Sequence, residues 1–163
     1  MDEYSRPATL EDLKALIRAL NEHAVDYLLI GGYALFVHGY YRATTDIDVL
    51  VPATAEAGRK VREALMVLPD RVAKDIDPGW FEEGENIRVA DEFIVDIMLN
   101  AGGETYDTLK QHAETIDLEG LQIRTINLEG LLRTKQSMRD KDVADRVIIE
   151  RALQALRSQE GKD

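Results

Sequence analysis

The stretch Tyr27–Pro52, YLLIGGYALFVHGYYRATTDIDVLVP, decides the fold. It begins with the short apolar run Tyr27–Ile30, which predicts a buried strand. The pair Gly31–Gly32 ends that strand, and Tyr33–His38 predicts a short helix. Residues Thr44–Val51 then predict a second strand, so the order is strand, glycine pair, helix and strand.

Two carboxylates lie on one face of the second predicted strand. Side chains alternate between the faces of a strand, so Asp46 and Asp48 project on the same side as Leu50. Their backbone positions are about 6.5 Å apart. Carboxylates at that spacing repel one another unless a cation lies between them. Oxygen ligands suit Mg²⁺, which binds one or two carboxylates together with substrate phosphates.

The glycine pair supplies the other half of a nucleotide site. Gly31 and Gly32 stand at a strand-to-helix turn, where glycine lets backbone N–H groups approach a phosphate closely. The positive end of the helix dipole favours the phosphate charge. The stretch therefore predicts a site for a nucleotide and its metal ion.

A third acidic residue lies on a later predicted strand. Residues Ile87–Ala90 and Glu92–Leu99 predict a strand pair that turns at Asp91. Within the second of these strands, Asp96 stands among apolar neighbours, where an unpaired carboxylate is unfavourable. We expect it to be ion-paired, metal-bound or at the open edge of the sheet. An isolated acid of this kind is more often ion-paired than catalytic.

A longer string of residues resembles a known family. It comprises Gly31-Gly32-x-Ala34, then His38-Gly39, then Arg42-x-Thr44-x-Asp46-Ile47-Asp48-Val49. This string resembles the nucleotidyltransferase superfamily, whose best-known member is DNA polymerase beta. Within it, the string is similar to a small bacterial group that includes the AbiEii-type and lincosamide-type enzymes. The resemblance extends from Tyr27 to about Glu150 and is weakest between Pro69 and Asn86.

The resemblance implies a fold and a set of metal ligands. The implied fold is α/β (α+β), a mixed β-sheet flanked by helices with further helices at the C-terminal end. The implied metal ligands and catalytic residues are Asp46, Asp48 and Asp96, with Mg²⁺ as the ion and Mn²⁺ as an alternative. We expect the three carboxyl groups to converge, with Gly31 and Gly32 across a cleft.

Two cations are implied as nucleotide-binding residues beside the glycines. Arg42 suits phosphate oxygens because its guanidinium is a planar fork, and its alternative role is an ion pair with Asp46 or Asp48. Lys135 is either a solvated helix residue or a cation directed at the phosphates. It belongs to a C-terminal phrase, residues 131–145, that also resembles the small bacterial group.

Composition limits the class of protein. The chain has 163 residues, no cysteine and a formal net charge of −11. The acidic charge argues against extended nucleic-acid binding, and the lack of cysteine excludes disulfides and zinc–thiolate sites. No apolar run approaches the length of a membrane span, and residues 1–9 carry no signal-peptide pattern. We expect a cytoplasmic protein with one domain over residues 1–163, its sheet core at about 9–126 and C-terminal helices at about 127–158.

The remaining elements follow from apolar periodicity and capping residues. Predicted helices are Thr9–His23, Ala53–Leu68, Glu104–His112, Leu128–Ser137 and Asp140–Arg157, the last with Val143, Val147, Ile148, Ala152 and Leu156 facing inward. A hairpin is predicted from Ala113–Leu118 and Leu121–Ile126. Residues Val72–Ile76 are interpreted as a short strand. Trp80 is interpreted as an edge aromatic that covers the core, with stacking on a base as the alternative.

The predicted activity is transfer of a nucleoside monophosphate from a nucleoside triphosphate such as ATP to a hydroxyl acceptor, with release of pyrophosphate. The acceptor stays open between a small molecule, an RNA end and a partner protein. Sugar-nucleotide transferases also use Asp-x-Asp with a metal, but they do not explain Gly31–Gly32. The stronger alternative is a binding protein of a toxin–antitoxin or phage-defence pair, with little or no catalysis.

Overall fold

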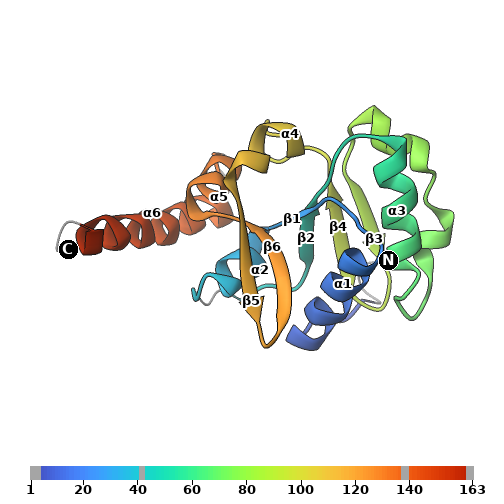
Figure 1. The fold of residues 1–163 in the computed structure, drawn as a ribbon, viewed down its shortest axis with the longest axis horizontal. Helices are drawn as coiled ribbons and strands as arrows, with labels where there is room; N and C mark the ends of the chain where they lie inside the picture. Colours follow the sequence, from blue (N-terminus) through green and yellow to red (C-terminus); the bar gives the residue numbers. More distant parts are fainter. Residues whose placement is uncertain (1–4, 41–42, 137–139, 161–163) are drawn as a thin grey trace.

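The computed structural model describes residues 5–40, 43–136 and 140–160. Within these residues, six strands form one mixed sheet in the order β3-β4-β2-β1-β6-β5 (Figure 1). The strands are β1 Leu28–Ile30, β2 Ile47–Leu50, β3 Ile87–Ala90, β4 Ile94–Met98, β5 Ala113–Leu118 and β6 Leu121–Ile126. Strand β2 is antiparallel to β1 and parallel to β4, and β1 is parallel to β6. The predicted mixed sheet is confirmed.

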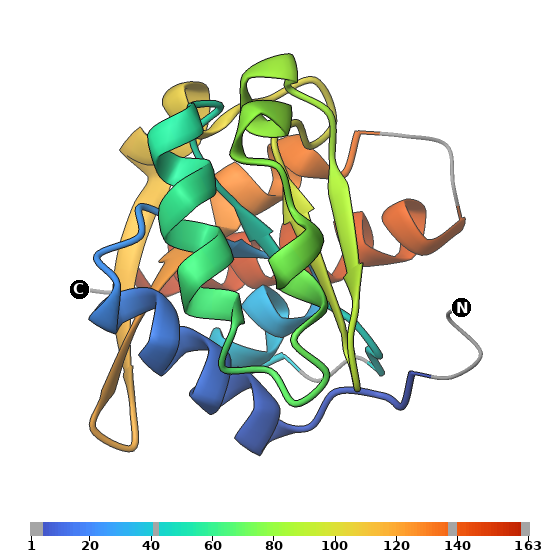
Figure 2. The ribbon, with the colours of Figure 1, turned by 90° about the vertical axis from the view of Figure 1, so that its right-hand side faces the viewer.

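Helices cover both faces of this sheet. The α-helices are α1 Leu10–Glu22, α2 Gly31–Val37, α3 Ala55–Leu65, α4 Tyr106–Leu109, α5 Leu128–Thr134 and α6 Asp140–Glu160. Short 3-10 helices are η2 Val72–Asp75, η3 Pro78–Glu83 and η4 Lys110–His112. Figures 1 and 2 show α1 and α3 on one face, with α2, α5 and α6 on the other. No helix of the described residues is long and apolar enough to cross a membrane.

Polar side chains fix the starts of the long helices. Thr9 and Asp12 form a reciprocal capping box on α1, and Asn127 caps α5. Thr54 caps α3, so this helix begins at Ala55 and not at Ala53. It ends at Leu65 and not at Leu68, because the last residues form turns.

The central strands separate the core from the candidate site. Ile47, Val49, Val95 and Ile97 are fully buried and alternate along β2 and β4. The residues between them in sequence project to the opposite face, which α2 and α5 flank. The alternation that buries the core thus also places the acidic residues on one side of the sheet.

The segment after α3 differs from the prediction. Residues Val72–Asp75 form the 3-10 helix η2 and not a strand. Arg71 precedes it in the left-handed region, with φ of 50°. The buried Asp91 carboxylate accepts the backbone N–H groups of Asp70 and Val72, at 2.8 and 3.0 Å. A strand needs a neighbouring ladder, and here a side chain takes up the N–H groups instead.

The inward face of α6 also differs from the prediction. Val143, Val147 and Leu156 are 39%, 44% and 46% exposed, so these three assignments to the core are wrong. Ala152 is buried as predicted, and Ile149 is fully buried. The buried face of α6, which carries Ile149 and Ala152, also carries two acidic residues. These pair with a lysine at the end of the neighbouring helix, as described below, and so turn that face inward. The C-terminal part of α6 extends away from the sheet (Figure 1).

The two neighbouring aromatic residues in η3 differ from the prediction in their burial. Phe81 is fully buried and packs in the core, whereas Trp80 is 42% exposed. Trp80 lines a small cavity of about 270 Å³ together with Glu83, Glu85 and residues 86–87. The residue that covers the core here is therefore Phe81.

Candidate active site

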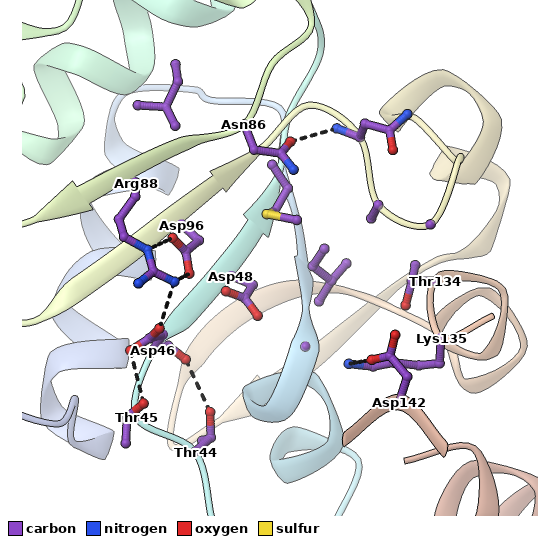
Figure 3. A pocket seen from close by; sticks show the side chains of 17 residues that line it. Thr44, Thr45, Asp46, Asp48, Asn86, Arg88, Asp96, Thr134, Lys135 and Asp142 are labelled. Carbon is purple, nitrogen blue, oxygen red and sulfur yellow. Dashed lines mark hydrogen bonds and ion pairs between the residues drawn. The ribbon is translucent and has the colours of Figure 1, made fainter. Parts of the chain in front are cut away.

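A polar pocket of about 550 Å³ opens on the α2 and α5 side of the sheet (Figure 3). Its lining comes from the ends of β1 and β2, from β3 and β4, from the loop at residues 100–102 and from α5 and α6. It includes the three predicted acids and the first glycine: Asp46, Asp48, Asp96 and Gly31. Segments far apart in the sequence thus meet at one opening.

Sheet register brings two of the acids together. Asp48 of β2 and Asp96 of β4 are direct partners on neighbouring parallel strands, so their side chains leave the same face of the sheet. Asp46 immediately precedes β2, and its carboxylate accepts a hydrogen bond from the Thr45 hydroxyl at 3.0 Å. All three carboxylates line the pocket, and those of Asp48 and Asp96 leave the same face of the sheet.

The glycine pair lies directly against the second acid. Gly31 has a φ of +73°, and a Cβ atom built on it would stand 2.2 Å from Asp48 Oδ2. Only glycine fits there, because both the backbone conformation and the space exclude a side chain. Gly32 is buried in the first turn of α2. Of the two glycines, Gly31 is the one that lines the pocket.

Arg88 was not anticipated from the sequence. It lies opposite Asp96 on β3, and its guanidinium holds that carboxylate with Nε–Oδ1 at 2.9 Å and Nη2–Oδ2 at 3.2 Å. The same Nη2 lies 3.4 Å from Asp46 Oδ2 (Figure 3). In the observed hairpin, residues 88 and 96 are equally distant from the centre of the turn at residue 92. The predicted turn at Asp91 is one residue too early and would pair Arg88 with Ile94, so the contact could not be read from it.

The donor set fits a hard divalent cation, but the described side chains are not gathered around one. Carboxylate oxygens of Asp46, Asp48 and Asp96 are the ligands that Mg²⁺ prefers. Across residues 5–40, 43–136 and 140–160, however, no group of three or more acidic or histidine side chains is arranged to hold an ion. The expected convergence is thus incomplete in this conformation, because Arg88 holds Asp96 and contacts Asp46.

Lys135 lies in the pocket wall in a buried ion cluster. Its Nζ atom is 3.0 Å from Asp145 Oδ2 and 3.8 Å from Asp142 Oδ1, both on α6. Lys135 is 7% exposed, and the two aspartates are 2% exposed or less. The lysine is therefore not a solvated helix residue: it lines the pocket and joins the end of α5 to α6. The guanidinium of Arg146 donates to the backbone carbonyl of Lys135 and reinforces this junction.

A further polar residue of the pocket, Asn86, positions one of its loops. Asn86 Oδ1 accepts the backbone N–H groups of Leu99 and Asn100, at 2.8 and 3.0 Å, and so fixes the loop after β4. His38 lies outside this pocket, at the end of α2, where its Nε2 bonds to the carbonyl of Ile126 at 2.8 Å. Arg42, the predicted phosphate cation, lies outside the described residues.

Comparisons with known proteins support the fold. No family model and no curated protein matches the chain. One similar solved structure is TM1012 from Thermotoga maritima, whose assignment as a nucleotidyltransferase is provisional. It has a TM-score of 0.52 at 15% identity, over 94% of this chain and 93% of that one. Another is the antibiotic-resistance factor ANT(2'')-Ia, with a TM-score of 0.51 at 15% identity, over 93% and 96% of the two chains.

A third similar structure is an antigenic nucleotidyltransferase-like protein from Paracoccidioides brasiliensis. Its TM-score is 0.50 at 17% identity, over 88% of this chain and 77% of that one. At these identities the likeness concerns the fold, and it extends over nearly the whole chain. The fold that the sequence predicts is confirmed: the chain has the fold of the nucleotidyltransferase superfamily.

Proposed function

We propose that the protein is a Mg²⁺-dependent nucleotidyltransferase, which moves a nucleoside monophosphate from a nucleoside triphosphate to a hydroxyl acceptor. The observation that carries the proposal is the pairing of Asp48 with Asp96 in one pocket, with Gly31 packed against Asp48. A pair of acids beside a strand-to-helix glycine supplies both a place for a metal ion and a close approach for phosphate. The fold supports the proposal at the level of reaction class.

Each pocket residue has a proposed role in binding the metal ion or the triphosphate. Asp46, Asp48 and Asp96 would hold Mg²⁺, which neutralises triphosphate charge and aligns the attacking and leaving oxygens. Gly31 leaves room for the phosphates beside Asp48, and Gly32 lies in the helix turn behind it. Arg42 is proposed as a phosphate cation because its fork matches phosphate oxygens. Lys135 holds α6 against the pocket wall and acts on the site through that packing.

The proposed reaction is an in-line displacement at the α-phosphorus. The acceptor hydroxyl oxygen forms a bond to the α-phosphorus, and the bond from that phosphorus to the α,β-bridging oxygen breaks. Pyrophosphate leaves with the electron pair of the broken bond. Asp96 is proposed to accept the proton of the hydroxyl group, since it stands beside Asp48 on the same face of the sheet.

Pyrophosphate release tests the proposal directly. The protein is incubated with Mg²⁺ and each of four labelled triphosphates, with and without a lysate that supplies acceptors. We expect acceptor-dependent pyrophosphate release that Asp48→Asn reduces at least about a hundredfold, because Asn removes a charged ligand without changing shape. Asp107→Asn, a change of the same kind in an exposed residue of α4, should leave the rate unchanged. No release by the wild-type protein with any triphosphate would contradict the proposal.

The second candidate function is binding of a partner protein with little or no catalysis. The observation in its favour is α6, which extends from the body with Val143 and Val147 exposed on one side. Apolar residues four apart on a helix form a stripe of the kind that docks in a groove. Binding of a co-purified partner that Val147→Ser weakens, together with absent pyrophosphate release, would favour this alternative.

A further inference from the structure

Arg88 occupies the space in which a cation would neutralise the acidic residues. Its guanidinium contacts both oxygens of Asp96 and one oxygen of Asp46. We propose that Arg88 is an internal counter-ion of the free protein, which a divalent cation displaces from Asp46 and Asp96. The displaced guanidinium then pairs with the triphosphate. This inference rests on the proposed function and assigns Arg88 two successive partners.

The cross-strand register makes Arg88 and the metal ion competitors. Because Arg88 lies directly opposite Asp96 on an antiparallel pair, the two side chains leave the same face of the sheet as neighbours. The guanidinium holds Asp96 through two parallel N–H···O bonds, which engage both carboxylate oxygens. A cation bound to those oxygens would meet the positive charge of Arg88 at contact distance. The two cations therefore cannot both hold Asp96 in this arrangement.

The ion pair is weak enough to exchange. The side chain of Arg88 is 48% exposed, and those of Asp46 and Asp96 are 26% and 15% exposed. Ion pairs this close to solvent contribute little, because water and salt screen them. A divalent ion brings twice the charge of a guanidinium, which favours it over Arg88 at these carboxylates. The ion pairs of Arg88 differ in this respect from those of Lys135, whose partners are buried.

The released guanidinium has a partner within the same pocket. Arg88 and Gly31 line one cavity, so a triphosphate beside Gly31 lies within the space that Arg88 reaches. The planar fork of arginine binds phosphate oxygens through two parallel hydrogen bonds, which a lysine ammonium cannot reproduce. Arg88 would thus oppose metal binding in the free protein and support nucleotide binding in the loaded one.

Two binding measurements with opposite expected signs test the proposal on the full chain. The first titrates Mn²⁺ alone, by the loss of its free electron-paramagnetic-resonance signal. Removal of two exposed ion pairs by Arg88→Gln should tighten Mn²⁺ binding roughly three- to tenfold. The second titrates a non-hydrolysable triphosphate at saturating Mn²⁺. Here Arg88→Gln should weaken binding roughly tenfold, and Arg88→Lys should restore only part of it.

Arg6→Gln is the matched control. Arg6 also bridges two carboxylates, Asp12 and Glu92, with a side chain that is 40% exposed, but it lies outside the pocket. Its removal should change neither affinity. A melting curve for each variant verifies that the chain is folded, and Arg88→Lys provides the conservative comparison if Arg88→Gln unfolds.

The possible results separate the inference from the proposed function. Tighter Mn²⁺ binding with weaker nucleotide binding in Arg88→Gln supports the inference. Unchanged or weaker Mn²⁺ binding in that variant overturns it, while the proposed function stands if the wild-type protein binds both ligands. Failure of the wild-type protein to bind Mn²⁺ with or without nucleotide overturns both.

Discussion

Asp48 Oδ2 occupies the position next to Gly31 into which a side chain at residue 31 would project. An ideal Cβ atom on Gly31 would lie 2.2 Å from that oxygen and 3.0 Å from Cγ of the same carboxylate. The glycine therefore fixes where the carboxylate of Asp48 stands, in addition to allowing the left-handed turn. This contact links the first strand-to-helix turn to the proposed metal site.

Gly31→Ala should disturb the site more than the fold. Alanine at a φ of +73° is strained by about 1–2 kcal/mol, and the displaced Asp48 carboxylate adds about 1 kcal/mol. Urea unfolding measures the sum, and triphosphate binding should be lost. Gly84→Ala is a matched control, because Gly84 has a φ of +75° with nothing within 4 Å of its added Cβ atom. The loss of unfolding free energy in Gly84→Ala should therefore reflect the backbone strain alone.

A double variant isolates the contact between the two residues. In the Asp48→Ala background, Gly31→Ala no longer meets a carboxylate and keeps only a 3.2 Å contact with Cβ of residue 48, so its effect on the free energy of unfolding should fall close to that of Gly84→Ala. An equal effect of Gly31→Ala with and without Asp48 would show that the close contact contributes nothing.

The sequence predicted the acids better than their surroundings. Alternation along one predicted strand placed Asp46 and Asp48 on the same face, and the family resemblance implied that Asp96 joins them. Arg88 was missed because its role depends on the pairing of two strands and not on periodicity within one. Sequence periodicity carries no information about which side chain stands opposite across a hairpin unless the turn is counted.

Buried charge explains the error in α6. An apolar stripe normally marks the inward face, but Asp142 and Asp145 are buried while Val143 and Val147 are exposed. The face was set by the ion partner of these acids, Lys135, which lies on another element. A pattern based on hydrophobicity alone counts buried aspartates as exposed, so it rotates the helix incorrectly.

Lys135→Met should destabilise the protein strongly, because it leaves the buried carboxylates of Asp142 and Asp145 without this cation. Loss of one member of a buried ion cluster costs about 3–5 kcal/mol. Chemical unfolding measures the change at pH 7. The control is Lys60→Met, since Lys60 makes an exposed pair with Glu56 at 3.6 Å, and its removal should cost less than about 0.5 kcal/mol. Similar effects of the two variants would place Lys135 in a solvated environment.

Mg²⁺ should stabilise the folded protein through the proposed acid ligands. At about ten times its dissociation constant, a ligand that binds only the folded state adds about 1.4 kcal/mol. For a chain of this size that corresponds to a rise in melting temperature of roughly 3–6 °C. Asp48→Asn should lose most of the rise. Scans with and without a non-hydrolysable triphosphate measure both responses, and a full shift in Asp48→Asn would place the metal elsewhere.

Without metal, the stability of Asp48→Asn tests how the acids are neutralised. Three adjacent carboxylates alone would repel, and removing one charge would then stabilise the protein. Arg88 already offsets part of that repulsion at Asp46 and Asp96. We therefore expect Asp48→Asn to melt within about 2 °C of the wild-type protein in the absence of metal, because relief of the remaining repulsion and loss of the contacts that Asp48 makes oppose one another. A much lower melting temperature would make Asp48 a structural acid.

Tyr27 should make stability fall at alkaline pH. Its side chain is buried, and burial raises the pKa of the hydroxyl above its ordinary value of 10. The folded state thus keeps its proton where the unfolded state loses it. The contribution of Tyr27 to the free energy of unfolding is fully present below pH 10. It declines as the pH rises from 10 toward the raised pKa, by up to about 1.4 kcal/mol per pH unit.

Tyr27→Phe isolates that contribution. At pH 7 the variant should be less stable by about 1–2 kcal/mol, because the hydroxyl donates to Asn21 Oδ1 at 2.9 Å and accepts from the Arg124 backbone N–H at 3.2 Å. The Phe variant has no hydroxyl at position 27, so ionisation of this residue does not affect its stability as the pH rises from 10 to 11. The stability advantage of the wild-type protein should therefore shrink by up to about 1.4 kcal/mol. Urea unfolding at pH 7, 10 and 11 measures the difference, which would stay constant if Tyr27 titrated alike in both states.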